Sequence, residues 1–323
     1  MSEKIMYECI DAGSEYCPCY LAETNDCITC SHLQGKSFCD CNWRGVCIYQ
    51  EYVWNNKKAK ETRKSFNGKI LEKKFIGKNL IIFKIAVLKT LARQLKQPGS
   101  YVFVRNPDKS EYFDVPMSVM YSDENTGEIH IAVQIIGSKT KSLIDLEDEI
   151  IVRGPYWNGL FGIKALKTTL NSNTLVVARG VALAPAVLVS KYLVKNNNKV
   201  TLILDRGKLE EIFIYEYLNK LNAIVIESDI TSESGKILIE ELLKNNKYEL
   251  CYSGGSERQH KEINKLLLKF SPETKYVISN NKKICCGEGI CGSCAVKIGE
   301  NIIKTCKAQI DSAYIVRKGE EDR

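Results

Sequence analysis

The sequence lacks the segments that a membrane-spanning or secreted chain requires. No run of about 18 apolar residues occurs. The best candidate, "TLVVARGVALAPAVLV", is broken by Arg179 and Pro185. The first residues, "MSEKIMYECIDAG", lack the charged segment and apolar core of a signal peptide. We therefore expect a cytoplasmic protein with no membrane helix.

Internal repeats and low-complexity tracts are also absent, so neither a repeat protein nor a disordered chain is indicated. Hydrophobic residues make up 44% of the 323 residues, which is enough to form cores. Basic residues are concentrated in 55–74, which holds eight basic and two acidic side chains. The positive charge of this segment is explained if it forms a solvated linker and the edge of a barrel. The alternative is that it forms a docking face for an acidic redox partner. Aromatic residues do not alternate with the basic ones, so nucleic acid is not expected as a partner.

Histidine is scarce and cysteine is abundant, with 3 and 14 residues respectively. In a reducing cytosol, so many cysteines indicate metal or cluster ligation rather than disulfides. Eight of the cysteines lie in the first 47 residues and five lie between Ile284 and Cys306. His32 is a candidate ligand, but a lone histidine in a loop is more often solvated.

The pattern of apolar and polar residues along the chain predicts an antiparallel β-barrel, followed by an α/β doubly wound parallel sheet. Cysteine-rich segments lie at both ends. Short β-branched or aromatic runs between residues 69 and 154 are typical of a small barrel. From Asn171 onward, apolar strands alternate with amphipathic stretches of helical length, such as residues 208–221 and 257–270. The expected domains are a cysteine-rich module (1–50), a linker (51–66), a barrel (67–158), a nucleotide-type α/β domain (159–280), and a cluster loop with tail (281–323).

The cysteines near the C-terminus are spaced as ligands of an iron–sulfur cluster. The spacing Cys286-x4-Cys291-x2-Cys294 is that of plant-type 2Fe-2S sites, and Cys306 suits the fourth ligand. The interleaved glycines Gly287, Gly289 and Gly292 allow positive φ and let backbone N–H groups point at sulfur. Zinc is the weaker alternative, because zinc sites do not need the glycine-rich lead-in. Cys285 would lengthen the first gap and is interpreted as a packed thiol.

From about residue 67 to 312 the chain resembles the electron-transfer subunit of class 1B dihydroorotate dehydrogenase, a branch of the ferredoxin–NADP reductase superfamily. The motif "CGEGICGSC" with Cys306 carries most of this resemblance. The resemblance implies an FAD-binding barrel, an NAD(P)-binding sheet and a C-terminal 2Fe-2S loop. It also implies a partner: a catalytic oxidoreductase subunit or an acidic redox protein, in a hetero-oligomer.

The same resemblance implies two FAD-binding segments. One is "VPMS" and the other is "GSKT", which begins 22 positions later in the sequence. Ser118 is expected to bond near the reactive flavin nitrogen, as the catalytic residue, and the turn with Lys139 is expected to hold the pyrophosphate. Val115 replaces the family's arginine, and Lys139 replaces a glycine and is expected to supply the missing charge. The residues predicted for FAD are Val115, Pro116, Met117, Ser118, Ala132, Val133, Gln134, Gly137, Ser138, Lys139 and Thr140.

The expected nucleotide turn has lost two or three of the family's glycines. It reads "ARGVALAP", so Ala182 places a Cβ where the backbone should approach a phosphate, and Arg179 is a candidate compensation. A sheet that keeps the fold but binds nucleotide weakly or not at all is the alternative. The predicted NAD(P) residues are Arg179, Gly180, Ala182, Asp205, Arg206, Ser253 and Gly254.

The N-terminal cysteines lie outside the family pattern and are similar only to extensions of related clostridial FAD/NAD-binding proteins. Fifty residues with few apolar positions need a metal for folding energy, and eight thiols match two four-thiolate sites. Zinc, 4Fe-4S clusters and free thiols all remain open. The residues are Cys9, Cys17, Cys19, Cys27, Cys30, Cys39, Cys41 and Cys47.

The main functional hypothesis is a redox subunit that passes electrons between NAD(P)H, FAD and a 2Fe-2S cluster to or from a partner subunit. The alternative is an electron-transfer or scaffold subunit that keeps FAD and clusters but no longer reacts with NAD(P)H.

Overall fold

The computed structural model describes residues 7–299 and 301–318 and divides into two compact units. The cysteine unit comprises Met1–Lys64 and Lys282–Asp311, and the barrel–sheet unit comprises Ser65–Asn281 and Ser312–Arg323. The cysteine-rich N-terminus and the C-terminal cluster loop therefore fold together, although they lie at opposite ends of the sequence.

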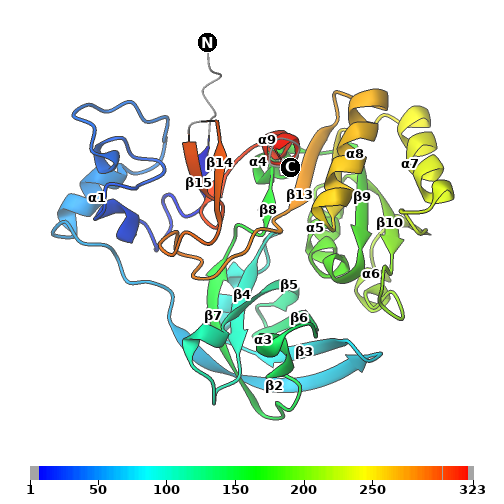
Figure 1. The fold of residues 1–323 in the computed structure, drawn as a ribbon, viewed down its shortest axis with the longest axis horizontal. Helices are drawn as coiled ribbons and strands as arrows, with labels where there is room; N and C mark the ends of the chain where they lie inside the picture. The colour runs from blue at the N-terminus through cyan, green and yellow to red at the C-terminus, as the bar shows by residue number, and fades with distance from the viewer. Residues whose placement is uncertain (1–6, 300, 319–323) are drawn as a thin grey trace. The chain divides into compact units, whose positions relative to one another are not determined.

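A closed six-stranded antiparallel barrel opens the barrel–sheet unit, in the order β2-β3-β6-β5-β4-β7 (Figure 1). Alternating side chains fill it, as in β3, where Ile81, Phe83 and Ile85 enter the barrel core. This confirms the predicted barrel. The strands are β2 (Ser65–Ile76), β3 (Leu80–Ala86), β4 (Tyr101–Arg105), β5 (Val115–Asp123), β6 (Glu128–Gln134) and β7 (Glu149–Tyr156).

The second half of this unit is a six-stranded sheet in the order β11-β10-β9-β12-β13-β8, parallel except for β8. Its strands are nearly continuous apolar runs because helices cover the sheet, as predicted. The strands are β8 (Leu160–Phe161), β9 (Asn173–Arg179), β10 (Lys199–Asp205), β11 (Ala223–Glu227), β12 (Leu250–Gly254) and β13 (Lys275–Ser279). The helices are α4 (Ile163–Thr168), α5 (Leu183–Lys195), α7 (Glu233–Asn245), α8 (Glu257–Phe270) and α9 (Ser312–Lys318).

The helix predicted over residues 208–221 is wrong in length, because only α6 (Tyr215–Leu218) forms. Ile212, Phe213 and Ile214 are buried one after another. A helix would turn three consecutive side chains to different sides, so the chain takes an irregular path that buries all three.

Helix α5 and α6 join the sheet to the barrel. Leu188 of α5 belongs to the barrel's hydrophobic core. The hydroxyl of Tyr217 in α6 lies 2.7 Å from Nδ1 of His130 in β6. Barrel and sheet therefore form one packed unit.

The cysteine unit has little regular structure. Its N-terminal part holds β1 (Glu8–Cys9), two 3-10 turns, η1 (Tyr20–Ala22) and η2 (His32–Gln34), and helix α1 (Ile48–Trp54). Its C-terminal part holds the hairpin β14 (Ala295–Ile298) and β15 (Asn301–Lys304), followed by β16 (Ala308–Gln309), which pairs with β1. A small core of Cys17, Ala22, Cys30, Leu33 and Ile48 holds the N-terminal part. Within residues 7–299 and 301–318, no helix combines the length and apolar character needed to span a membrane.

Candidate functional site

The four cysteines predicted as cluster ligands gather around one glycine-rich loop. Gly287, Gly289 and Gly292 all have positive φ, between 73° and 78°, as their sequence positions predicted. The β14–β15 hairpin returns the chain so that Thr305 donates through its backbone N–H and its hydroxyl to the carbonyl oxygen of Cys294. That fold-back brings Cys306 beside Cys294. Cys294 and Cys306 are buried, whereas Cys291 is exposed.

Hydrogen bonds to sulfur favour the thiolate form in this loop. Cys306 donates to the sulfur of Cys286, which also accepts the backbone N–H groups of Cys291 and Glu288, the latter at 3.3 Å. These contacts lower the pKa of Cys286 to about 4 against the opposing effect of burial. Cys306 likewise lowers the pKa of Cys294 to about 6. Thiolates are the ligand form of cysteine, so the loop suits iron.

A 2Fe-2S cluster divides its four protein ligands between two iron atoms, so each iron takes two of them. A single metal ion would instead need three or four protein ligands around it. In the described residues, no three His, Cys, Asp or Glu side chains are arranged to hold a single metal ion. The paired arrangement of Cys286 with Cys291 and Cys306, and of Cys294 with Cys306, is compatible with a two-iron cluster.

A buried quartet of charges lies next to this loop, and sequence reasoning missed it. The ammonium of Lys307 lies 2.5 Å from Asp11 and 2.7 Å from Glu288. The guanidinium of Arg63 lies 2.8 Å from Asp11 and 3.3 Å from Glu288, and stacks over the Tyr16 ring. The exposed fraction of each charged side chain is at most 11%.

The quartet is neutral overall, and each charge has two partners of opposite sign. Burial alone would raise the pKa of Asp11, but Lys307 and Arg63 hold it below its usual range. The same two cations lower the pKa of Glu288 against the effect of burial. Asp11 comes from the N-terminal segment, Arg63 from the connector, and Glu288 and Lys307 from the cluster loop. The quartet therefore connects the separate segments of the cysteine unit.

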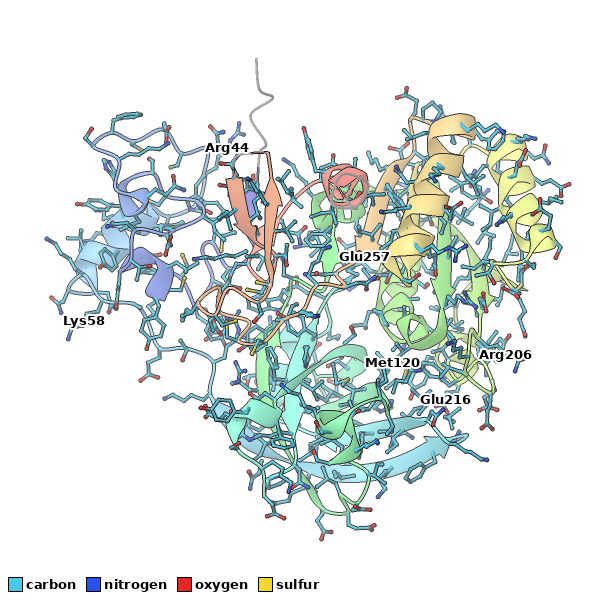
Figure 2. The ribbon with its side chains drawn as sticks, in the orientation of Figure 1. Arg44, Lys58, Met120, Arg206, Glu216 and Glu257 are labelled. Carbon is cyan, nitrogen blue, oxygen red and sulfur yellow. The ribbon has the colours of Figure 1, made fainter. Side chains whose placement is uncertain are left out.

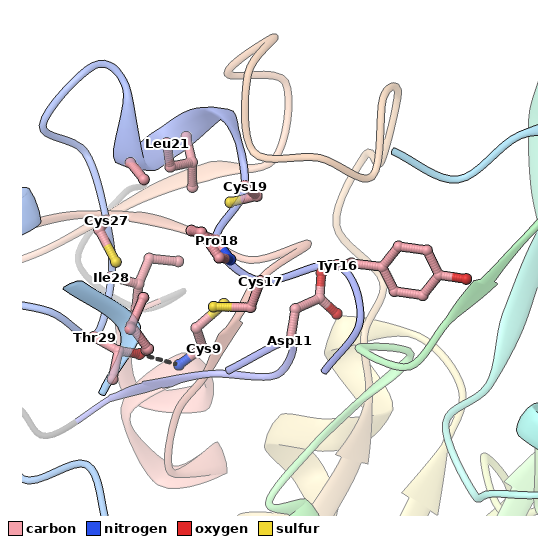
Figure 3. A pocket seen from close by; sticks show the side chains of 12 residues that line it. Cys9, Asp11, Tyr16, Cys17, Pro18, Cys19, Leu21, Cys27, Ile28 and Thr29 are labelled. Atoms are coloured by element: carbon pink, nitrogen blue, oxygen red, sulfur yellow. Dashed lines mark hydrogen bonds between the residues drawn. The ribbon is translucent and has the colours of Figure 1, made fainter. Parts of the chain in front are cut away.

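Four of the eight N-terminal cysteines lie around one cavity, and the other four lie outside its lining. Cys9, Cys17, Cys19 and Cys27 line one narrow cavity (Figure 3). The sulfurs of Cys39 and Cys41 lie 3.8 Å apart, and Cys47 is exposed. Burial raises the pKa of Cys17 to about 12, so this thiol is protonated when no metal is bound.

The two segments predicted for FAD come together in the barrel. Residues 115–118 begin β5 and are half-buried, unlike the buried Val119 and Met120 that follow. No hydrogen bond joins the Ser118 hydroxyl to another residue in the described part of the chain, which leaves it available to a ligand. Thr140 closes the Gly137 turn by accepting the N–H groups of Ile136 and Gly137 at 2.9 and 3.2 Å.

Lys139 links these segments. Its ammonium donates to the backbone carbonyl oxygen of Asp114 at 2.9 Å. Asp114 precedes Val115, the residue expected to replace the family's arginine. A Cβ added at Gly137 would meet no atom within 4 Å, so the turn borders open space. The expected compensation of Val115 by Lys139 therefore has a geometric basis.

Two arginines that the sequence reading overlooked add positive charge at the same end of β5. Arg153 of β7 lies 2.9 Å from Asp114 and over the rings of Phe103 and Tyr156. Arg105 of β4 lies 2.9 Å from the other carboxylate oxygen of Asp114. Together with Lys139, they leave a net positive charge around one carboxylate, which suits an anionic group such as a phosphate.

The three residues expected to line the flavin on β6 do not face the same way. Val133 is part of the barrel core, so its side chain is not available to a ligand there. Ala132 and Gln134 lie on the opposite face of the strand; Ala132 is 3% exposed and Gln134 is half-buried.

The predicted nucleotide residues meet at the carboxyl edge of the parallel sheet. The turn after β9 is the 3-10 helix η4 (Gly180–Ala182), and Gly180 has a φ of 61° with open space beside it. Gly254 at the end of β12 lies against the carbonyl oxygen of Ala182. An open cleft of about 340 Å3 lies beside them and is lined by Arg179, Leu204, Asp205, Arg206, Gly207, Ile212, Glu227, Ser228 and Asp229. Doubly wound sheets bind nucleotides at this edge.

Three of these residues, Arg179, Asp205 and Arg206, already have protein partners. Asp205 pairs with Arg179 at 3.1 Å and accepts the backbone N–H groups of Gly207 and Ile230. The carboxylate is therefore engaged by three donors, and Arg179 is directed to Asp205. Arg206, labelled in Figure 2, hydrogen-bonds the carbonyl oxygen of Glu210 at 3.2 Å.

Ser253 is fully buried, and a histidine that the sequence reading did not select holds it. Its hydroxyl lies 3.0 Å from Nδ1 of His260, whose Nε2 meets Ser279 and Asn281 at 3.2 and 3.1 Å. Ser253 therefore shapes the end of β12 from within the sheet.

Comparison with known proteins identifies relatives that are similar to this chain in sequence. The chain is 30% identical over 203 residues to a probable dihydroorotate dehydrogenase B (NAD(+)), electron transfer subunit, of Pyrococcus horikoshii. The match covers 62% of this chain and 73% of the relative. This chain belongs to the dihydroorotate dehydrogenase B electron transfer subunit family. The resemblance predicted from the cluster motif is confirmed.

Two further relatives differ in how much of the chain they match. The family member from Archaeoglobus fulgidus is 28% identical over 212 residues, covering 65% of this chain and 82% of the relative. An uncharacterized protein from the adh 3' region of Clostridium beijerinckii is 25% identical over 252 residues, covering 74% of this chain and 82% of that protein. No family model matches the chain.

Solved structures show the same fold at lower identity. The NADH-dependent reduced ferredoxin-NADP oxidoreductase has a TM-score of 0.62 and 23% identity, and the match covers 74% of this chain and 85% of that chain. The ferredoxin reductase of carbazole 1,9a-dioxygenase has a TM-score of 0.51 and 13% identity. The match covers 66% of this chain and 69% of that chain.

Proposed function

We propose that this family member is a flavin and iron–sulfur electron-transfer subunit that carries electrons between NAD(P)H and a partner oxidoreductase subunit. The gathering of Cys286, Cys291, Cys294 and Cys306 in one glycine-rich loop is the observation that carries this proposal. The names of the family relatives support the electron-transfer role and the existence of a partner.

The residues of the chain suit the two cofactors that this function needs. When bound, FAD takes up electrons in pairs and a 2Fe-2S cluster passes them singly. Lys139 and the Gly137 turn would hold the FAD pyrophosphate, and the half-buried Ser118 would hydrogen-bond the flavin ring. The N–H donors of Glu288 and Cys291 would stabilise the negative charge on the sulfur of Cys286.

The nicotinamide step would use the carboxyl edge of the parallel sheet, where two observations favour different functions. The cleft at the carboxyl edge of the sheet favours nucleotide binding. The Arg179–Asp205 pair favours the alternative, an electron-transfer subunit that no longer reacts with NAD(P)H, because it engages the carboxylate that would bind a ribose. A ligand that reaches Asp205 must first displace Arg179.

Replacement of one cluster ligand tests the division of labour between the two units. Cys291→Ser should remove the 2Fe-2S spectrum and leave FAD bound, since the barrel belongs to the other unit. Reduction of FAD by a nicotinamide cofactor should continue, and transfer to one-electron acceptors should fall at least tenfold. Absorbance, electron paramagnetic resonance (EPR) and flavin content measure the three effects.

Cys285→Ser is the matched control, because Cys285 is exposed and adjoins the loop without belonging to the predicted ligand set. A Cys291→Ser protein that keeps its 2Fe-2S resonance contradicts the assigned ligands. A wild-type protein that binds FAD and iron but is not reduced by NADH or NADPH supports the alternative function.

A further inference from the structure

A second set of thiols surrounds a cavity within the N-terminal part of the cysteine unit. Cys9 comes from β1, Cys17 and Cys19 from the loop before η1, and Cys27 from the loop after it. Figure 3 shows their sulfurs turned toward the space between these loops. The chain thus brings together four thiols that are spread over 19 residues of sequence.

Backbone N–H groups are directed at three of these four sulfurs. Asp11 donates to Cys9, Gly13 donates to Cys17, and both Thr29 and Cys30 donate to Cys27, the last at 3.4 Å. Two of these bonds come from the residue two positions after the cysteine. The bond from Glu288 to Cys286 in the C-terminal cluster loop has the same offset.

Backbone donors around sulfur are a feature of thiolate sites, because they offset the negative charge of a metal-bound thiolate. A buried thiol in an ordinary core does not need two amide donors. The hydrogen-bonding pattern around Cys27 is therefore that of a ligand rather than of a packed side chain.

The cavity lies directly beside the cluster loop, within the same unit. Cys9 pairs with Ala308 across the β1–β16 ladder, two residues after Cys306. Leu21, which lines the cavity, lies against Gly289 of the cluster loop, where an added Cβ would come within 3.0 Å of its side chain. A centre in the cavity would thus be a neighbour of the 2Fe-2S loop.

We propose that Cys9, Cys17, Cys19 and Cys27 form a four-thiolate centre for a thiophilic metal, separate from the C-terminal cluster. The shared chemistry is thiolate ligation. In the described residues no three such side chains are arranged around a single metal ion. The structure therefore favours the iron of a 4Fe-4S cluster, and a zinc ion is the other outcome of the test. A cubane cluster takes one ligand at each iron and keeps the sulfurs apart around the cavity, whereas zinc would draw all four inward. This centre does not rest on the proposed reaction with NAD(P)H.

The hydrophobic core of this segment is small, so a bound metal would stabilise its fold. Five buried side chains, two of them cysteines, make up its hydrophobic cluster. Such a core is too small to order some 40 residues unaided, and metal ligation commonly supplies that free energy.

The test compares metal content in full-length proteins purified without oxygen. Cys19→Ser and the double variant Cys17→Ser/Cys27→Ser should each lose about four iron atoms with their sulfide, or about one zinc ion, relative to wild type. The 2Fe-2S resonance and the FAD content should remain, which shows that the C-terminal loop and the barrel are folded. Iron and sulfide analysis distinguishes the cluster from zinc.

Cys285→Ser serves as the control for loss of an exposed thiol, and its metal content should equal that of wild type. Unchanged iron and zinc in both cavity variants would overturn the proposal. Loss of the 2Fe-2S resonance together with the cavity metal would also overturn it, because the two cysteine groups would then form one site. Neither result depends on whether the protein reacts with NADH or NADPH.

Discussion

Lys139 is the residue whose role changes most between sequence and structure. From the sequence we expected it to compensate for Val115, and in the structure its ammonium reaches the carbonyl oxygen of Asp114 beside Val115. It thereby places a positive charge where the family's arginine is lost. A single side chain thus links the Gly137 turn to the start of β5.

Lys139→Met should weaken FAD binding about tenfold, equivalent to about 1.4 kcal/mol, because one charge-assisted contact to an anionic ligand is lost. Flavin fluorescence on dilution measures the dissociation constant. Lys141→Met, on the same short helix α3 (Ser138–Lys141), is the control and should leave the affinity within twofold. Equal effects of the two substitutions would show that Lys139 acts only through general charge.

At the scale of structural elements, the quartet of Asp11, Arg63, Glu288 and Lys307 fixes the cluster loop to the N-terminal segment and the connector. The exposed fraction of each member's side chain is at most 11%, so each depends on the others for compensation of its charge. Removal of one partner from such a group leaves a buried charge uncompensated, which costs far more than loss of a surface pair.

Lys307→Met should destabilise the cysteine unit by about 3–5 kcal/mol. Lys304→Met is the matched control: Lys304 pairs at 3.5 Å with Asp26, whose side chain is 55% exposed. Loss of that pair should cost about 0–1 kcal/mol. Urea unfolding followed by 2Fe-2S absorbance compares the two variants, and similar midpoints would contradict the structural role of the quartet.

Local patterns predicted the elements well where one segment determines its own fold. The glycines of the cluster loop have the positive φ that their positions required, and the β-branched runs form the barrel strands. The helix over 208–221 was predicted too long because its apolar residues are buried in series rather than along one face.

Contacts between distant residues could not be predicted in this way. Arg63 meets Glu288 across 225 positions of sequence, and Lys307 meets Asp11 across 296. The pairing of Arg179 with Asp205 likewise depends on two adjacent strands, although each residue was correctly placed at the carboxyl edge of the sheet. The predicted ligand sets for FAD, NAD(P), the 2Fe-2S cluster and the N-terminal metal stay predictions.

At the scale of the whole molecule, we propose that FAD and the nucleotide bind to the barrel–sheet unit and that the cluster binds to the cysteine unit. The central claim is that electrons pass from the nicotinamide cofactor through FAD to the 2Fe-2S cluster. This claim joins the two units in one function, and it is independent of the second thiolate centre.

The most direct test is anaerobic addition of NADH or NADPH to the purified full-length protein, with flavin absorbance and cluster EPR recorded together. One of the two nucleotides should bleach the flavin band, and the rhombic resonance of a reduced 2Fe-2S cluster should then appear. Cys291→Ser should show the bleaching without the resonance. A wild-type protein loaded with FAD and iron in which neither nucleotide produces either change would contradict the account.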